Sequence, residues 1–200
     1  MSDKEKAKQE LLYSLIKELS ETYQFARDIH LHNEMSTFHR DWVGLYNFRD
    51  ALDHLRKMLL ALFDEKIDVD KAREEFAEMK AHLCRGINEG SENVAEFYLG
   101  KIWRKWRPQS VYRLAFLKAP TEEEIVTGIS MGIQRIEYGR KKKPTNWKES
   151  VEAFKEAEEI LRELERKLPE VQDIRFRLFA IFMPIISLLI GIGIGIVRVF

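Results

Sequence analysis

The longest uncharged stretch of the chain constrains its fold most, because it is long enough to cross a lipid bilayer. Residues 178–197 carry no charge between Arg177 and Arg198, and Ser187 is their only side-chain hydrogen-bonding group. A helix rises about 1.5 Å per residue, so this stretch spans about 30 Å, the thickness of the hydrocarbon core. The alternative is a buried core helix, but core helices usually keep a polar stripe. The stretch therefore predicts a transmembrane helix at 178–197.

Positive charges are unevenly distributed around this stretch. Only Arg198 follows it, in a short tail of residues 198–200. The basic residues that precede it closely are Arg162, Arg166, Lys167, Arg175 and Arg177. The positive-inside rule then places residues 1–170 in the cytoplasm, joined to the membrane by a basic connection, 171–177. The N-terminus lacks a signal-peptide pattern, so we expect a C-terminal tail anchor, and the lone Cys84 fits a reducing compartment.

Small residues recur every four positions within the span. Ser187, Gly191 and Gly195 would form one stripe on a helix, and such stripes let two membrane helices approach closely. The pattern favours self-association of the chain through its transmembrane helix. The alternative is that glycine is simply common in membrane helices.

Helical periodicity dominates the rest of the chain. Basic and acidic residues number 33 each, so no net charge favours a nucleic-acid partner. Apolar residues at spacings of three and four predict helices over 4–35 and 40–64. No stretch alternates as a strand would, so we expect an all-α cytoplasmic multi-helix bundle followed by one C-terminal transmembrane helix. The expected inner residues are Leu12, Leu15, Leu19, Tyr23 and Ala26, then Trp42, Leu45, Phe48, Leu52, Leu55, Leu59 and Leu62.

Capping residues and helix breakers divide the remaining sequence. Asp68 or Asp70 can cap a third helix. Gly86 and Gly90 mark its expected end, and Ser91 is expected to cap a fourth helix. Pro108 and Pro169 are expected stops, and Thr121–Glu124 and Asn146–Glu149 are expected capping boxes. The last helix before the membrane has an expected inner stripe of Val151, Phe154, Leu161, Leu164 and Leu168, with outer pairs Glu158–Arg162 and Glu163–Lys167.

One short segment alternates tryptophan with basic residues. Its members are Lys101, Trp103, Arg104, Lys105, Trp106 and Arg107. Tryptophan prefers the lipid interface and basic side chains bind anionic headgroups, so the segment could lie on the membrane. It could also bind single-stranded nucleic acid through stacking and phosphate contacts. The alternative that we prefer is structural, with both tryptophans in the core and the charges facing water.

No pattern specifies a metal or a cofactor, so we expect neither. Five histidines are present, but the Glu-x-x-His and His-Glu-x-x-His spacings are absent, and these spacings are typical of helical di-iron and zinc sites. His30 and Glu34 lie one turn apart and could share a metal or merely a hydrogen bond. Residues 128–132 match a nucleophile elbow, but no histidine follows Ser130, as that chemistry requires. We expect their glycines to allow a close helix crossing or a kink.

Arg49, Asp50 and His54 form the pattern Arg-Asp-x-x-x-His in the second predicted helix. It resembles the Arg-x4-6-His motif of the HEPN superfamily, all-α domains of which many are metal-independent ribonucleases that act as dimers. The resemblance implies that Arg49 binds the scissile phosphate, that His54 assists proton transfer and that Asp50 supports both. The alternative is a salt-bridge ladder in which Arg49 and Arg56 flank Asp53.

Two functions follow as expectations. The first is a non-enzymatic, single-pass membrane protein whose cytoplasmic helical domain acts as an interaction or scaffolding module. Its partners would be the lipid bilayer, a second copy of the chain through the transmembrane helix, and an unknown cytoplasmic protein. The second is a membrane-tethered, HEPN-like ribonuclease of a defence or toxin–antitoxin system, which would bind nucleic acid.

Overall fold

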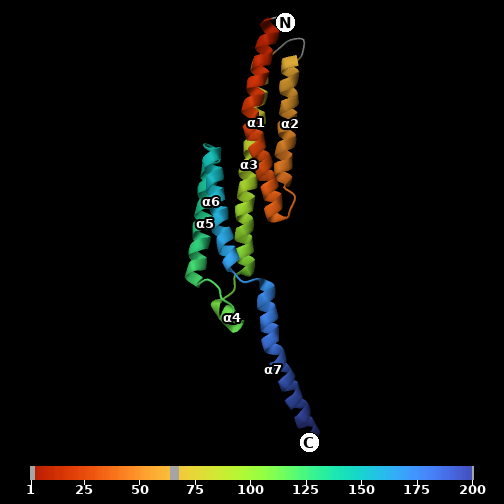
Figure 1. Ribbon diagram of the computed structural model, residues 1–200, viewed down its shortest axis with the longest axis vertical. Coiled ribbons are helices and arrows are strands. Elements are labelled where there is room, and N and C mark those ends of the chain that lie inside the picture. Colours follow the sequence, from red (N-terminus) through yellow and green to blue (C-terminus); the bar gives the residue numbers. More distant parts are fainter. Residues whose placement is uncertain (1–2, 64–67, 200) are drawn as a thin grey trace. The chain divides into compact units, whose positions relative to one another are not determined.

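The described residues of the computed structural model, 3–63 and 68–199, form helices and contain no strand. Side chains are described for residues 5, 6, 8–63 and 68–192. This confirms the all-α prediction. In chain order the helices are α1 Asp3–Thr37, α2 Trp42–Phe63, α3 Val69–Lys105, α4 Gln109–Leu114, α5 Glu122–Lys142, α6 Trp147–Lys167 and α7 Val171–Val199 (Figure 1).

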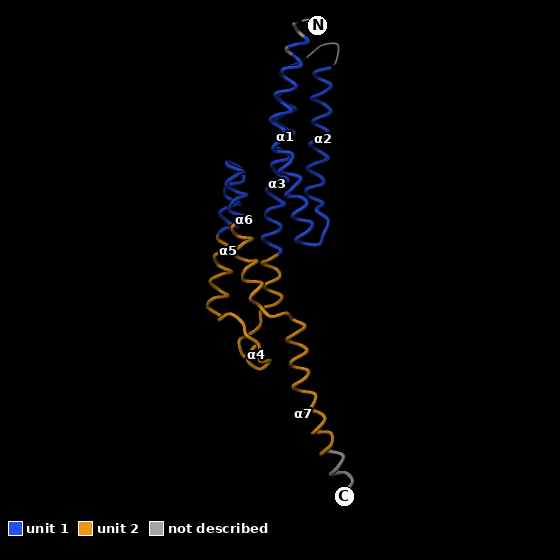
Figure 2. The backbone as a smooth tube through the Cα atoms, viewed as in Figure 1, with its two compact units in different colours: residues 1–97, 135–155 blue, residues 98–134, 156–200 orange. Residues whose placement is uncertain are grey.

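The chain divides into two compact units, coloured separately in Figure 2. Unit 1 contains residues 1–97 and 135–155, and unit 2 contains residues 98–134 and 156–200. Helices α3, α5 and α6 each pass from one unit into the other. The expected cytoplasmic domain therefore contributes residues to both units.

The core of unit 1 brings α1, α2 and α3 together, and these helices lie side by side in Figure 1. The inner face of α2 differs from the predicted one. Leu62 and Phe48 do pack inward, but Leu52 is 63% exposed and Trp42 and Leu45 also face solvent. The inward positions belong to smaller or more flexible residues, which let α2 approach its neighbours more closely than a row of leucines would. These residues are Gly44, Ala51, Met58 and Ala61.

Helix α3 corrects the prediction that a helix ends at Gly86 and Gly90. It runs through both glycines and past Ser91 without a break. A Cβ added at Gly90 would lie 2.9 Å from Cγ2 of Ile29 in α1. Close packing against α1 therefore explains this glycine, at a cost of about 1 kcal/mol in helix propensity. Ser91 is not a cap, because its hydroxyl donates to the carbonyl of Ile87 one turn back (2.8 Å).

The two predicted capping boxes and the two proline stops are confirmed. The amide of Glu124 donates to Thr121 Oγ1 (3.2 Å), and the amide of Thr121 donates to the Glu124 carboxylate (2.7 Å). These two bonds are the reciprocal pair of a capping box at the start of α5. The amide of Glu149 likewise donates to Asn146 Oδ1 (3.3 Å) at the start of α6. Helix α3 ends three residues before Pro108, and α6 ends two residues before Pro169.

An ion-pair cluster links α3 to the end of α5 within unit 1. Arg140 binds Glu92 (2.5 Å) and also Glu96, and Lys143 binds Glu92. Burial acts to raise the pKa of Glu92, but the hydrogen bonds from Lys143 and Arg140 outweigh it and hold the pKa below its ordinary value. The Glu92 carboxylate is therefore stabilised in its charged form by the fold.

In unit 2, α5 crosses α6 at the two glycines of the 128–132 motif. A Cβ added at Gly128 would lie 2.8 Å from Leu164, and one added at Gly132 would lie 2.5 Å from Leu161. The close-crossing prediction is confirmed. Ser130 sits exposed in mid-helix rather than on a strand-to-helix turn, so it is not a nucleophile elbow. The predicted inner stripe of α6 is buried throughout, and both predicted pairs form, Glu158–Arg162 at 3.4 Å and Glu163–Lys167 at 3.0 Å.

Helix α7 is an apolar helix that could span a membrane. Its 29 residues continue through Pro184, and only 6% of its most apolar 18-residue stretch is buried. Ser187 and Gly191 are exposed, and a Cβ added at Gly191 would meet no atom within 4 Å. The surroundings of Gly195 lie outside the described side chains. The fold prediction is thus confirmed as far as an all-helical chain with one C-terminal helix able to cross a bilayer.

Candidate functional site

Two histidines of unit 1 face each other between α2 and α3. The rings of His54 and His82 stack with their centroids 5.2 Å apart and their planes 27° apart. Both side chains are largely buried. Each has an acidic residue one turn before it on the same helix, Asp50 before His54 and Glu78 before His82. The two helices therefore bring two acid–histidine pairs to one place.

Carboxylates surround the two imidazoles. His54 Nδ1 lies 2.7 Å from Glu75 Oε2, a hydrogen bond between half-buried partners. His82 Nδ1 lies 3.9 Å from Asp50 Oδ2, beyond hydrogen-bond distance. Among the described residues this nitrogen is buried and has no hydrogen-bond partner. Ligand atoms of His54, Glu78 and His82 all lie within 4.8 Å of one another, close enough to be drawn around one metal ion.

Burial and the neighbouring charges favour a neutral imidazole at His82 next to a charged carboxylate at Asp50. Burial, followed by the nearby Arg85, lowers the pKa of His82, while Asp50 acts in the opposite direction. The hydrogen bond from Arg49 lowers the pKa of Asp50. At neutral pH His82 is therefore an unprotonated imidazole with an available lone pair.

The side chains of Arg49 and His54, the two ends of the ribonuclease-like motif, bind different carboxylates. Arg49 donates to Asp50 (2.8 Å), and its side chain is 70% exposed. His54 is instead directed to Glu75 on α3. The expected ladder forms in part, because Asp53 pairs with Arg56 at 3.2 Å and not with Arg49.

The tryptophan-rich basic segment does not bury both tryptophans, as its structural interpretation expected. Its inward side chains are Ile102 and Lys105, whereas Trp103 is exposed. Lys105 binds Glu165 (2.6 Å) and Glu170 (2.5 Å). Burial alone would lower the pKa of Lys105, but these two carboxylates raise it above its ordinary value. Lys105 is thus a buried cation paired with two carboxylates of unit 2.

Among the other residues of this segment, one caps helix α3 and two are exposed to solvent. The Arg107 guanidinium donates to the carbonyls of Arg104 (2.9 Å) and Trp106 (2.6 Å), so it caps the end of α3. The rings of Trp103 and Trp106 lie 5.3 Å apart. Lys101 lies 4.0 Å from Glu165. Trp103 and Arg104 therefore form the outward part of the segment.

The beginning of α7 contacts the short helix α4 within unit 2. Arg177 donates to the carbonyl of Phe116, just after α4 (3.4 Å). Phe116 has a positive φ of 52° and is 80% exposed. A phenylalanine in this backbone region is uncommon. The turn therefore displays an aromatic ring to solvent beside the start of the apolar helix.

His30 contributes to the cap of a helix. Its Nδ1 lies 3.0 Å from Asp41 Oδ2, and the other carboxylate oxygen of Asp41 accepts the amide of Gly44 (2.9 Å). Glu34 accepts the amide of Asp41 (3.1 Å). Asp41 is therefore the N-cap of α2, and the His30–Glu34 spacing serves that cap.

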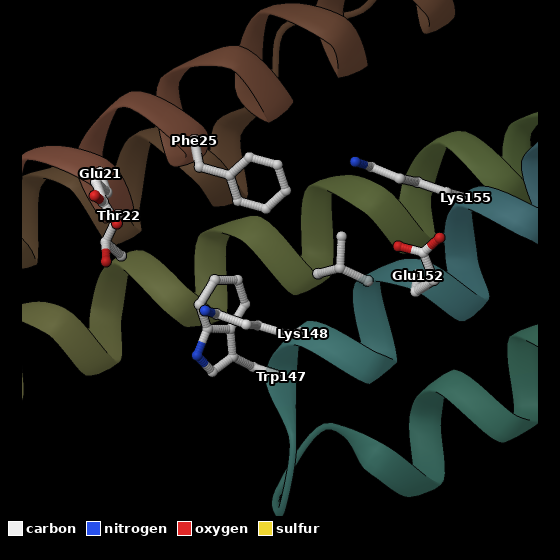
Figure 3. A pocket seen from close by; sticks show the side chains of 8 residues that line it. Glu21, Thr22, Phe25, Trp147, Lys148, Glu152 and Lys155 are labelled. Atoms are coloured by element: carbon white, nitrogen blue, oxygen red, sulfur yellow. The ribbon is translucent and has the colours of Figure 1, made fainter.

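An open groove of about 340 Å³ lies between α1 and the first turns of α6 in unit 1 (Figure 3). Its aromatic residues, Phe25 from α1 and Trp147 from α6, have ring centroids 6.1 Å apart. Lys155 lies 4.9 Å above the Phe25 ring. The two aromatic rings suit the burial of an apolar group.

No family model, no curated protein and no solved structure matches this chain. The HEPN resemblance therefore rests on Arg49, Asp50 and His54 alone. The histidine cluster of α2 and α3 is interpreted from its own chemistry.

Proposed function

We propose that this chain is a single-pass membrane protein in which α7 crosses the bilayer and the helical units form a cytoplasmic interaction module. The observation that carries the proposal is the exposure of apolar side chains along α7, where Leu188 is 65% exposed. Moving each large apolar side chain out of water contributes roughly 1.5–3 kcal/mol. A bilayer supplies that environment for the whole helix at once, and helical backbone bonds are satisfied internally, apart from the Ala180 carbonyl that would accept from residue 184, where a proline stands.

Residues of unit 2 suit the membrane surface on the side where α7 begins. Arg175 and Arg177 lie in the first turns of α7, and the positive-inside rule favours the cytoplasm for them. Phe116, held beside α7 by Arg177, and the exposed Trp103 would lie at the level of the lipid headgroups, where aromatic rings are favoured.

The interaction module is supported by the outward face of α2 in unit 1. Apolar side chains recur along it at helical spacing and face solvent. They are Trp42, Leu45, Leu52, Leu59 and Phe63. Exposed Arg49 and Arg56 interrupt this row, but so many large apolar side chains exposed on one helix face favour a protein interaction site. A cytoplasmic protein that covers this face is the partner that the proposal requires.

Membrane fractionation of a charged variant tests the proposal. Leu188→Arg with Leu189→Arg would add about 5–7 kcal/mol to the insertion free energy, at about 2.5–3.5 kcal/mol for each arginine near the helix centre. We expect the wild type to resist alkaline extraction and the double variant to reach the supernatant. Leu52→Arg, at a similarly exposed position of α2, is the matched control and should stay in the membrane. Extraction of the wild type itself would contradict the proposal.

The ribonuclease ranks second, because Arg49 and His54 are directed to different carboxylates. It makes a distinct prediction. Induced expression of the wild type would be toxic and would cleave RNA, and His54→Ala would abolish both effects. That result would reverse the ranking. Equal growth and intact RNA on expression of the wild type and of His54→Ala would contradict the ribonuclease function.

A further inference from the structure

We propose that His54, Glu78 and His82 bind one divalent transition-metal ion, for which zinc is the best fit. Their ligand atoms come from two neighbouring helices of unit 1 and already lie within 4.8 Å of one another. Zinc bonds of about 2.0–2.2 Å in a tetrahedron place neighbouring ligand atoms about 3.3 Å apart. Side-chain rotation must therefore close the site by up to about 1.5 Å. Glu78 is exposed, so its side chain is free to rotate toward the two rings.

The donor set selects the class of metal. Two imidazoles and one carboxylate suit zinc and related transition metals, whereas calcium and magnesium prefer all-oxygen sites. The same set of two histidines and one glutamate holds zinc in three-ligand sites whose fourth position is open to water. The exposed side of Glu78 leaves room for that fourth ligand.

The surrounding carboxylates occupy the positions of outer hydrogen-bond partners. Glu75 binds His54 Nδ1 (2.7 Å), which leaves Nε2 of that ring as the ligand atom. Carboxylates in this position fix the ring orientation of metal-binding histidines. Asp50 lies 3.9 Å from the buried, unpartnered Nδ1 of His82. An approach of about 1 Å would complete the same arrangement there.

The local charges agree with a bound cation. Asp50, Glu75 and Glu78 place three carboxylates around the two rings. The nearby cations include Arg49, paired with Asp50, Lys57, paired with Asp53, Arg85, and Lys71, one turn before Glu75 on α3. A divalent ion would offset the remaining negative charge and would link α2 to α3.

Zinc binding by the full chain in detergent tests the proposal. We expect calorimetric titration with Zn²⁺ to show one equivalent bound, and Co²⁺ at the same site to show the visible absorption of a tetrahedral complex. His82→Asn should weaken binding more than 100-fold. Glu75→Gln, which removes an outer partner, should weaken it roughly 10–100-fold.

Glu78→Gln is the deciding variant, because its side chain is exposed and the substitution is expected to leave the fold intact. It should weaken zinc binding at least 10-fold, whereas the matched control Glu74→Gln, one turn earlier on the same exposed side of α3, should change it less than twofold. Circular dichroism should show equal helix content in both variants. Absence of stoichiometric zinc binding by the wild type, or equal binding by these two variants, would overturn the proposal.

Discussion

Replacing Gly132 by alanine tests the close crossing of α5 and α6, because the crossing decides whether the substitution raises or lowers the free energy of unfolding. In Gly132→Ala the new Cβ would lie 2.5 Å from Cδ2 and 2.7 Å from Cγ of Leu161, which is fully buried. Carbon atoms pack at about 3.5–4.0 Å, so both contacts are too close. Rotation of the outer leucine bond moves Cδ2 but leaves Cγ in place. Either the buried Leu161 must leave its rotamer or the helices must separate, and such overpacking costs about 1–3 kcal/mol.

Gly100 is the matched control, since it lies in a helix of the same unit and a Cβ there would meet no atom within 4 Å. Both alanines gain about 1 kcal/mol in helix propensity. Gly100→Ala should therefore stabilise the chain by that amount. Because the gain is common to both variants, the difference in their free energies of unfolding equals the overpacking cost, about 1–3 kcal/mol.

Chemical denaturation of the full chain in detergent, followed by far-ultraviolet circular dichroism, measures this difference. The expected order of stability is Gly100→Ala, wild type, Gly132→Ala. A Gly132→Ala chain as stable as Gly100→Ala would show that α5 and α6 do not cross closely here. The interpretation of the 128–132 glycines as a helix contact would then be wrong.

Three further predictions concern other parts of the chain. The lowered pKa of Glu92 means that its carboxylate stabilises the fold above the unfolded carboxyl pKa of about 4.3, and that this contribution is lost as pH falls through the lower folded value. Glu92→Gln should therefore flatten the acid decline in unfolding free energy, and an unchanged pH profile would contradict this. Asp41→Ala should cost about 2 kcal/mol through loss of the α2 cap, and Asp41→Asn much less; equal losses in thermal melts would refute the capping role. Gly191→Ile with Gly195→Ile should abolish self-association in a membrane two-hybrid assay, and unchanged association would end the oligomer hypothesis.

Capping boxes and prolines predicted several helix ends correctly. The Thr121 and Asn146 caps depend on residues within three positions, so their side chains determine the outcome directly. The glycines of α3 show the limit of this reasoning. Gly90 resembles a helix end in sequence, yet packing against Ile29 in α1 gives it a different role. Such long-range contacts override local propensity.

The sequence pointed to only some of the residues of the candidate site. Asp50 and His54 were singled out for their resemblance to a ribonuclease motif, whereas Glu75, Glu78 and His82 were not. A usable signal was present, because an acidic residue precedes a histidine by four positions in both α2 and α3. Its meaning depends on which faces of the two helices meet, and the rotated inner face of α2 was not predicted. Packing between helices, which sequence periodicity describes only approximately, decides such sites.

The environment of the α7 side chains tests the central claim most directly. Leu188→Cys and Leu60→Cys would be spin-labelled separately in a Cys84→Ser background and reconstituted into liposomes; both leucines are exposed, at 65% and 55%. If α7 crosses the bilayer, the label at 188 will collide more with oxygen, which concentrates in hydrocarbon, than with a water-soluble paramagnetic reagent. The label at 60 will show the opposite preference. Equal access of the water-soluble reagent to both positions would contradict the membrane-spanning helix.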